Sequence, residues 1–112
     1  MSLNTLENMV NWVDNNIKMN PTLEDMSSFV GYSPYYCSAK FHEYMGITFK
    51  QYIAKRKLKY ATIDIKDTNK KILDIALEYG FSSQEAFTRA FVAAYGRTPY
   101  KYRKELINVC DS

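Results

Sequence analysis

The sequence has few of the residues on which metal, cofactor and disulfide chemistry depend. Its 112 residues include two cysteines, one histidine and four glycines. Cys37 and Cys110 make neither a disulfide framework nor a CxxC pair, so both are predicted to be free thiols. His42 has no acidic or cysteine ligands beside it, and no glycine-rich phosphate loop or HExxH motif occurs. We therefore expect no metal, no cofactor and no enzyme activity.

Long hydrophobic runs are also missing. No apolar stretch approaches the roughly 20 residues that a membrane-spanning helix needs. The acids and asparagines near the start do not fit a signal peptide. With 46% hydrophobic and 15% aromatic residues, the chain can form the core of one domain. The sequence predicts a soluble, cytoplasmic protein without a membrane partner.

Positive charge is concentrated in part of the chain. The net charge is +3, but residues 1–32 hold one lysine and four acids, whereas residues 33–112 hold fourteen Lys or Arg and eight acids. Nine basic and three acidic residues lie between Lys40 and Lys71. Such a segment attracts a polyanion, although lysine-rich faces are also common on solvated helices that bind no nucleic acid.

The chain contains an internal duplication. At an offset of 49, Leu23 to Ser33 superposes on Ile72 to Ser82, which matches Gly31 with Gly80. After one inserted residue, an offset of 50 matches Phe41 with Phe91 and Gly46 with Gly96. Two copies of one supersecondary unit imply two copies of one binding surface.

Hydrophobic periodicity predicts an all-α fold. A first helix ends at Asn20-Pro21, and glycines end most of the later ones. A long helix runs from Thr48 to about Asp67, and a short last helix runs from Thr98-Pro99 through Tyr102. The expected inner faces include Met26 and Phe29, then Cys37, Phe41 and Tyr44, and in the second copy Phe87, Ala90, Phe91, Ala94 and Tyr95.

Polar residues at the predicted helix starts fit N-caps. Thr22, Ser33 and Ser82 are expected to cap, and Thr48 with Gln51 has the spacing of a capping box. Lys71 is a poor cap, so Thr68 or Asn69 is an alternative start for the helix before Gly80.

Two short helices around a glycine turn are typical of a helix-turn-helix, whose second helix enters the major groove of DNA. The core stripe of the second copy places Glu85, Thr88, Arg89 and Val92 on the outer face, with Gln84 at the helix start. Arginine can grip guanine, glutamine can pair with adenine, and threonine offers a hydroxyl and a methyl. Ser82 and Glu85 are also spaced as a capping box, and Arg89 could be a solvated helix arginine.

The outer face of the first copy carries Tyr35, Ser38, Ala39 and His42. This surface is more apolar and suits contacts with thymine methyls and phosphates.

The second copy contains, in order, the strings Ile72-Leu73-Asp74-Ile75-Ala76, Gly80-Phe81, Phe87-Thr88-Arg89-Ala90-Phe91, Gly96 and Thr98-Pro99-Tyr100-Lys101-Tyr102-Arg103. With these strings at these spacings it resembles the AraC/XylS family of bacterial transcription regulators. Gly31-Tyr32-Ser33, Phe41, Gly46 and Tyr52-Ile53 extend the resemblance over about residues 5–105.

The resemblance implies a single DNA-binding domain of seven helices across residues 1–112. Two homeodomain-like helix-turn-helix subdomains, 5–47 and 68–106, would be joined by a linker helix, 48–67, with a tail at 107–112. Both recognition helices would enter successive major-groove segments of double-stranded promoter DNA. Contact with RNA polymerase, activation of transcription, and a nucleoid location in the bacterial cytoplasm are further implications.

The family's base-contacting positions fall on residues in both recognition helices: Pro34, Tyr35, Ser38, Ala39, Ser83, Gln84, Glu85, Thr88 and Arg89. Phosphate contacts are assigned to five basic residues: Lys40, Lys50, Lys55, Lys101 and Arg103. Ala39 stands where many members have a longer polar reader, and Val92 replaces a common lysine.

The match leaves no room for a ligand-sensing or dimerisation domain, and Met1-Ser2-Leu3 suits an engineered start. The chain is therefore expected to be either a stand-alone short member of the family or the C-terminal domain of a larger, signal-responsive regulator, and we favour the second alternative. The alternative function is a helical protein-protein interaction module with a solvated basic face.

Overall fold

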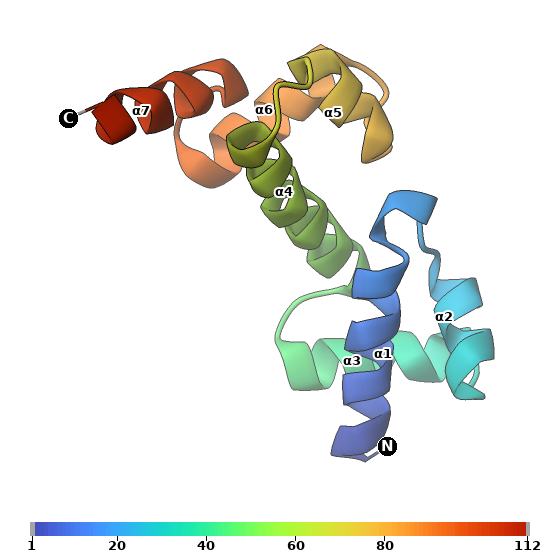
Figure 1. Cartoon of the computed structure of the whole chain (residues 1–112). Coiled ribbons are helices and arrows are strands. Elements are labelled where there is room, and N and C mark those ends of the chain that lie inside the picture. The colour runs from blue at the N-terminus through green and yellow to red at the C-terminus, as the bar shows by residue number, and fades with distance from the viewer. Residues whose placement is uncertain (1, 112) are drawn as a thin grey trace. The chain divides into compact units, whose positions relative to one another are not determined.

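The computed structural model describes the backbone of residues 2–111 and the side chains of residues 2–105. Within this part of the chain the fold has seven α-helices, one short 3-10 helix and no strand (Figure 1). The elements are α1 (Leu3–Asn15), η1 (Ile17–Met19), α2 (Leu23–Val30), α3 (Pro34–Met45), α4 (Phe49–Asp67), α5 (Ile72–Glu78), α6 (Gln84–Tyr95) and α7 (Pro99–Asp111). The predicted all-α fold class is confirmed. Over the same residues, no helix combines the length and the apolar character needed to cross a bilayer.

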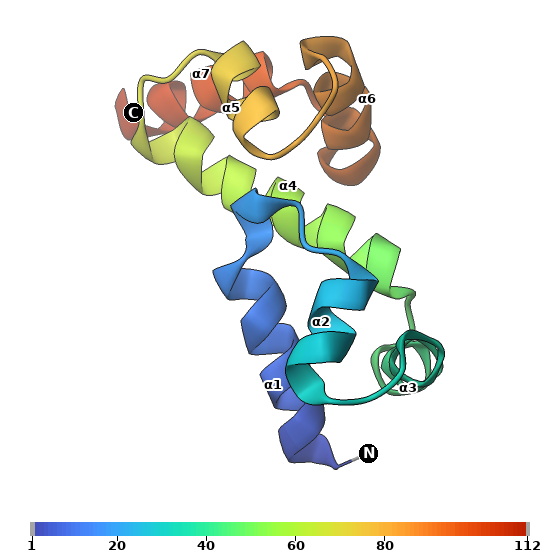
Figure 2. The ribbon, with the colours of Figure 1, turned by 90° about the vertical axis from the view of Figure 1, so that its right-hand side faces the viewer.

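The chain divides into two compact units, Met1–Arg56 and Lys57–Ser112, with the boundary inside α4. In the first unit α1 packs on α2 and α2 on α3; in the second, α5 packs on α6 and α6 on α7. Short turns join α2 to α3 and α5 to α6 (Figure 2). The duplication is visible in the helix bounds, because α3 and α6 are each 12 residues long and begin 50 positions apart.

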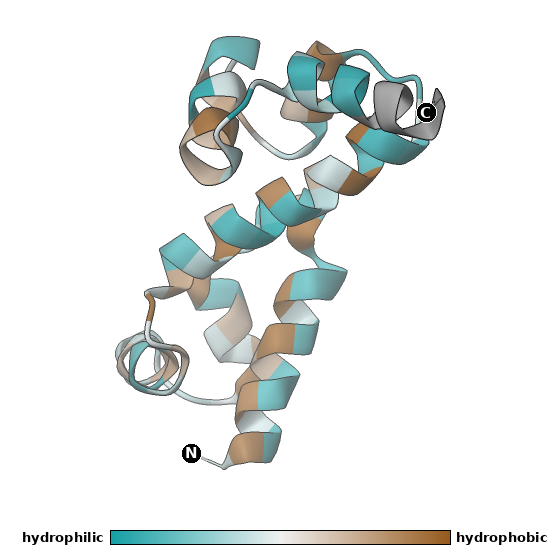
Figure 3. Ribbon diagram, turned by 90° about the vertical axis from the view of Figure 1, so that its left-hand side faces the viewer, coloured by the Kyte–Doolittle hydropathy of each residue, from teal (hydrophilic) through white to brown (hydrophobic). Residues whose placement is uncertain are grey.

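Each unit has its own hydrophobic core. In the first, Met9, Val13, Met26, Cys37 and Phe41 are completely buried. Hydrophobic and hydrophilic bands alternate along α1 in Figure 3, as expected for a helix with one buried side. In the second unit the completely buried side chains include Ala61, Ile75, Ala76, Phe87 and Phe91.

Several residues expected on inner faces lie outside the core. Phe29 is 60% exposed and stacks on Trp12, and Tyr44 is 46% exposed. Ala94 is exposed, while Ala90 and Tyr95 are half-buried. Sequence periodicity identifies the side of a helix that faces the core. How many residues on that side are buried depends on the neighbouring helix that packs against it.

Cys37 lies on the buried side of α3 and is a free cysteine, as predicted. Burial raises the pKa of its thiol, because the charged thiolate is poorly solvated there. The equivalent position in α6 is Phe87. The prediction of a free thiol at Cys110 falls on a side chain outside the described residues.

Three of the four predicted side-chain caps begin helices at the predicted places. The hydroxyl of Thr22 accepts a bond of 3.1 Å from Asp25 N, and that of Ser33 accepts one of 3.2 Å from Tyr36 N. Thr48 and Gln51 form the full capping box: Gln51 N donates to Thr48 Oγ1 at 3.1 Å, and Thr48 N donates to Gln51 Oε1 at 2.9 Å.

The predicted cap at Ser82 is wrong. Ser83 is the N-cap of α6, and its Oγ accepts a bond of 3.1 Å from Ala86 N. The inserted residue of the second copy therefore precedes the cap, so Ser83 and not Ser82 corresponds to Ser33. Since the third residue of the helix is then Ala86, the suggested capping box of Ser82 with Glu85 is not formed.

Three other helix ends differ from the expectation. Helix α1 ends at Asn15, before the predicted end at Asn20-Pro21, and the 3-10 helix η1 follows it. Helix α5 begins at Ile72 after Lys71, which makes no side-chain cap. Thr68 does not start this helix, because its hydroxyl donates to Asp64 O at the end of α4. Helix α7 continues to Asp111, well beyond Tyr102.

Polar contacts tie each part of α4 to its own unit. In the first unit the Arg56 guanidinium donates to both carboxylate oxygens of Asp14 on α1, at 3.0 and 3.3 Å. In the second unit the Tyr79 hydroxyl donates to Asp64 Oδ2 at 2.7 Å. Burial, followed by this bond to a carboxylate, raises the pKa of Tyr79.

Replacing Ser83 with alanine should remove the cap of α6 and lower the free energy of unfolding by about 0.5 to 2 kcal/mol. Ser82→Ala is the matched control, because this neighbouring serine is exposed and caps no helix, and its effect should stay within about 0.5 kcal/mol. Urea unfolding of both variants tests the assignment. A larger loss for Ser82→Ala would return the cap to the position predicted from sequence.

Tyr79→Phe should lower the free energy of unfolding by about 1 to 2 kcal/mol, because a buried hydroxyl bonded to a carboxylate is lost. The raised pKa keeps Tyr79 protonated in the folded protein, whereas a tyrosine in the unfolded chain has a pKa of about 10. The advantage of the wild type should therefore shrink as the pH rises above about 10. Tyr100→Phe is the control, since Tyr100 is 60% exposed. Equal losses for the two variants would contradict the assigned bond.

Candidate nucleic-acid interface

The outer face of α6 presents four polar side chains together. Gln84, Glu85 and Arg89 are exposed, Thr88 is half-buried, and the four line an open pocket of about 580 Å³. The buried Phe87 between them fixes this orientation of the helix. Among the described residues, none of the four side chains has a hydrogen-bond or ion-pair partner. The structure thus brings together the α6 residues that periodicity placed on one face.

Two predicted α6 readers also affect the helix itself. Ser83 is half-buried, and its oxygen accepts the capping bond from Ala86 N, which leaves the hydroxyl hydrogen as a donor. Glu85 lies in the first turn, where a carboxylate interacts favourably with the helix dipole. Its structural role comes from this position rather than from a capping box. Val92 continues the same face and is 39% exposed.

The outer face of α3 is aromatic and carries little charge. Tyr35 is 86% exposed, Pro34, Ala39 and His42 are exposed, and Ser38 is half-buried. Beside this row, Tyr32 stacks on Tyr36 with ring centroids 5.1 Å apart. The two recognition faces therefore share a backbone but differ in chemistry: α3 offers apolar contact and hydroxyls, whereas α6 offers charged and amide groups.

Three of the predicted phosphate ligands, Lys50, Lys55 and Lys101, have exposed side chains. Lys40 is different, because its Nζ pairs with Glu43 Oε2 at 3.2 Å and lies 5.8 Å from the centre of the Tyr36 ring. The hydrogen bond to Glu43 raises the pKa of Lys40. A phosphate at Lys40 would have to replace this carboxylate.

The structure gives Arg103 a role other than the predicted phosphate contact. Its guanidinium is half-buried and donates to Ile65 O at 3.0 Å and to Thr68 O at 3.2 Å. These are carbonyls at the C-terminal end of α4, which lack partners within the helix. Arg103 therefore holds α7 against the end of α4, and a phosphate would have to bind through Nη1, which these two bonds do not use.

Sequence reasoning missed one ion pair next to α6. Arg97, directly after the C-cap Gly96, pairs with Glu105 on α7. No sequence pattern signals this pair, because the seven residues between the two cover a loop and nearly two turns of α7. Among the described residues, no group of His, Cys, Asp or Glu side chains is arranged to hold a metal ion.

Comparison with known proteins places this geometry in a family. Residues 26–105 match the family described as a helix-turn-helix domain. The transposon Tn10 TetD protein of Escherichia coli is 34% identical over 99 residues, which cover 88% of this chain and 72% of that protein. The regulatory protein SoxS of Salmonella typhimurium is 31% identical over 101 residues, covering 90% of this chain and 94% of SoxS.

A solved structure agrees in fold. The crystal structure of a transcriptional regulator with an AraC-type DNA-binding domain from Chromobacterium violaceum is similar with a TM-score of 0.88. The two chains are 26% identical, and the match covers 93% of each. From the family match, the related sequences and the shared fold, this chain belongs to the AraC/XylS-type helix-turn-helix family, whose members are DNA-binding transcription regulators and not enzymes.

Proposed function

We propose that this domain recognises a specific sequence in double-stranded DNA by inserting α3 and α6 into successive segments of the major groove. The observation that carries the proposal is the row of Gln84, Glu85, Thr88 and Arg89, which lies on the outer face of α6 and has no partner within the described part of the chain. Exposed arginine and glutamine side chains on a recognition helix suit direct reading of base edges.

The two helices have different tasks in this proposal. Arg89 reads guanine, Gln84 reads adenine, and Thr88 contacts a thymine methyl or a base edge. Glu85 accepts from a cytosine amino group, and Ser83 donates its hydroxyl hydrogen to the backbone or a base. Base preference is therefore stronger in the segment that α6 enters.

Helix α3 contributes mainly contact area. Pro34, Tyr35, Ser38 and Ala39 contact thymine methyls, sugars and phosphates, and their apolar character gives a weaker base preference.

Lysines outside the outer rows hold the DNA backbone. Lys50, Lys55 and Lys101 contact phosphates directly, and Lys40 does so after leaving Glu43. These contacts add affinity without sequence preference and make binding weaker as salt concentration rises.

The finer regulatory predictions rest on the family resemblance. We propose that the domain activates transcription through contact with RNA polymerase, which run-off transcription from a promoter carrying the selected site tests. Membership of a larger, signal-responsive regulator is tested by the reading frame upstream of the Met1 codon.

Selection of bound duplexes from a random-sequence library tests the main proposal. A DNA reader should enrich one sequence and bind it far better than a scrambled duplex. The logarithm of its binding constant should fall linearly with the logarithm of the salt concentration. The alternative, a protein-protein interaction module, should show neither behaviour.

Arg89→Ala should weaken binding to the selected sequence by about 1 to 3 kcal/mol and relax base preference at one position. The physical reason is the loss of a bidentate contact to one base. Titration of duplexes varied one base pair at a time measures both effects. An equal loss of affinity for selected and scrambled duplexes would assign Arg89 to the backbone instead.

Lys101→Ala should weaken binding to all duplexes alike, because one phosphate contact disappears. The salt slope, that is, the slope of the logarithm of the binding constant against the logarithm of the salt concentration, should fall in magnitude by about one. Affinities for selected and scrambled duplexes at several salt concentrations measure the slope. An unchanged slope, or a loss confined to the selected sequence, would contradict a phosphate contact.

A further inference from the structure

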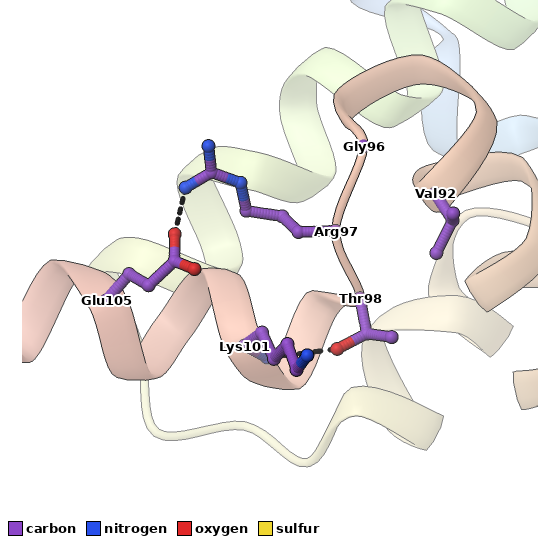
Figure 4. A pocket seen from close by; sticks show the side chains of 6 residues that line it. All are labelled: Val92, Gly96, Arg97, Thr98, Lys101 and Glu105. Atoms are coloured by element: carbon purple, nitrogen blue, oxygen red, sulfur yellow. Dashed lines mark hydrogen bonds and ion pairs between the residues drawn. The ribbon is translucent and has the colours of Figure 1, made fainter.

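A second pocket adjoins the recognition face of α6. It has a volume of about 380 Å³ and is lined by Val92, Gly96, Arg97, Thr98, Lys101 and Glu105 (Figure 4). Val92 also belongs to the outer row of α6 that carries Thr88 and Arg89. A DNA strand bordering the groove that α6 enters would therefore run past this pocket.

The pocket is built around one acid and two basic side chains. Arg97 pairs with Glu105, and each of these side chains is 47% exposed. Lys101, one turn before Glu105 on α7, adds a second positive charge. An ion pair this exposed is weak and exchanges readily for another anion. Arginine binds phosphate in the same bidentate manner as carboxylate, so a phosphodiester is a suitable replacement.

The duplication shows that this charge arrangement is particular to the second unit. At the offset of 50, Ile47, Gln51 and Lys55 stand where the second unit has Arg97, Lys101 and Glu105. In the first unit the Gln51 side chain accepts a bond from Thr48 N and completes a capping box. Lys101 has no acceptor atom, so it cannot play this part at Thr98. Its charge is instead available at the pocket.

We infer that Arg97 and Lys101 form a DNA-phosphate site, and that Glu105 occupies the Arg97 half of this site while the protein is free. The inference rests on the proposed DNA-binding function. On binding, a phosphate of the strand beside α6 replaces the Glu105 carboxylate at Arg97. Glu105 therefore lowers the affinity for every sequence alike and does not contribute to base preference.

Glu105→Gln, made in the full chain, removes the competing charge and keeps the shape of the side chain. With a scrambled duplex as the probe, the affinity should rise about two- to fivefold at low salt, the range that a weak exposed ion pair allows. The salt slope should become steeper by up to one, since Arg97 then releases a counterion of its own. Arg97→Ala should weaken binding to the same duplex. In the Arg97→Ala background, Glu105→Gln should give no gain.

Glu78→Gln is the matched control for net charge. Glu78 pairs with Lys70 at 3.1 Å, and these side chains are 36% and 42% exposed, but neither residue lines the pocket. A gain for Glu105→Gln no larger than that for Glu78→Gln would overturn the inference, because net charge alone would explain it. A gain that persists without Arg97 would overturn it as well.

These variants distinguish a failure of the inference about Glu105 from a failure of the proposed DNA binding. If Arg89→Ala and Lys101→Ala behave as DNA-contact variants while Glu105→Gln is neutral, only the inference about Glu105 is wrong. If the wild type shows no salt-dependent binding to any duplex, the proposed function itself is wrong. Far-UV circular dichroism of each variant checks that the total helix content is unchanged.

Discussion

The rotational setting of α3 and α6 depends on aromatic burial along one side of each helix. Phe87 and Phe91 are completely buried in α6, as are Cys37 and Phe41 in α3. A buried phenylalanine contributes about 1.5 to 3 kcal/mol relative to an exposed one. A small rotation of α6 about its axis would bring these rings toward water, so burial on one side holds the polar row outward on the other.

This setting is reinforced differently in the two units. In the second, Phe91 is in contact with three further rings, those of Phe87, Tyr95 and Tyr102, with centroid separations of 4.8 to 5.7 Å. In the first, Phe41 meets Phe49 and Tyr52 at the start of α4. Each recognition helix is thus packed against the helix that follows it, and the glycine turn between them sets the change in direction.

Most of the fold could be predicted from the sequence because helix starts, helix ends and buried faces are each determined by residues close together in the chain. Glycine ends, hydroxyl caps and apolar spacing placed nearly every helix, and the phase of Phe87 and Phe91 placed Thr88 and Arg89 outside. The predictions were wrong where the burial of a side chain depends on how far an adjacent helix extends over it. Phe29 and Tyr44 fit an inner stripe but lie beyond the surface that adjacent helices cover. Ser82 was predicted as the cap of α6, but the adjacent Ser83 holds this position, because its backbone places Oγ where it accepts from Ala86 N.

Long-range polar contacts were beyond any sequence pattern. Arg103 looked like a surface cation because its segment is basic, yet its partners are carbonyls more than thirty positions away on α4. The same limit applies to Arg56 with Asp14 and to Tyr79 with Asp64. Charge spacing along the chain could not separate cations that are available to a phosphate from those already engaged.

The buried thiol of Cys37 gives the first unit a built-in chemical reporter. An alkylating reagent needs both access and a thiolate, and the folded unit withholds both, because the side chain is covered and its pKa is raised. In a Cys110→Ser background, the rate of labelling would therefore measure how often α3 separates from its support. The second unit has Phe87 at the matching position and offers no thiol to the reagent in this background. The labelling rate would therefore report the opening of the first unit alone.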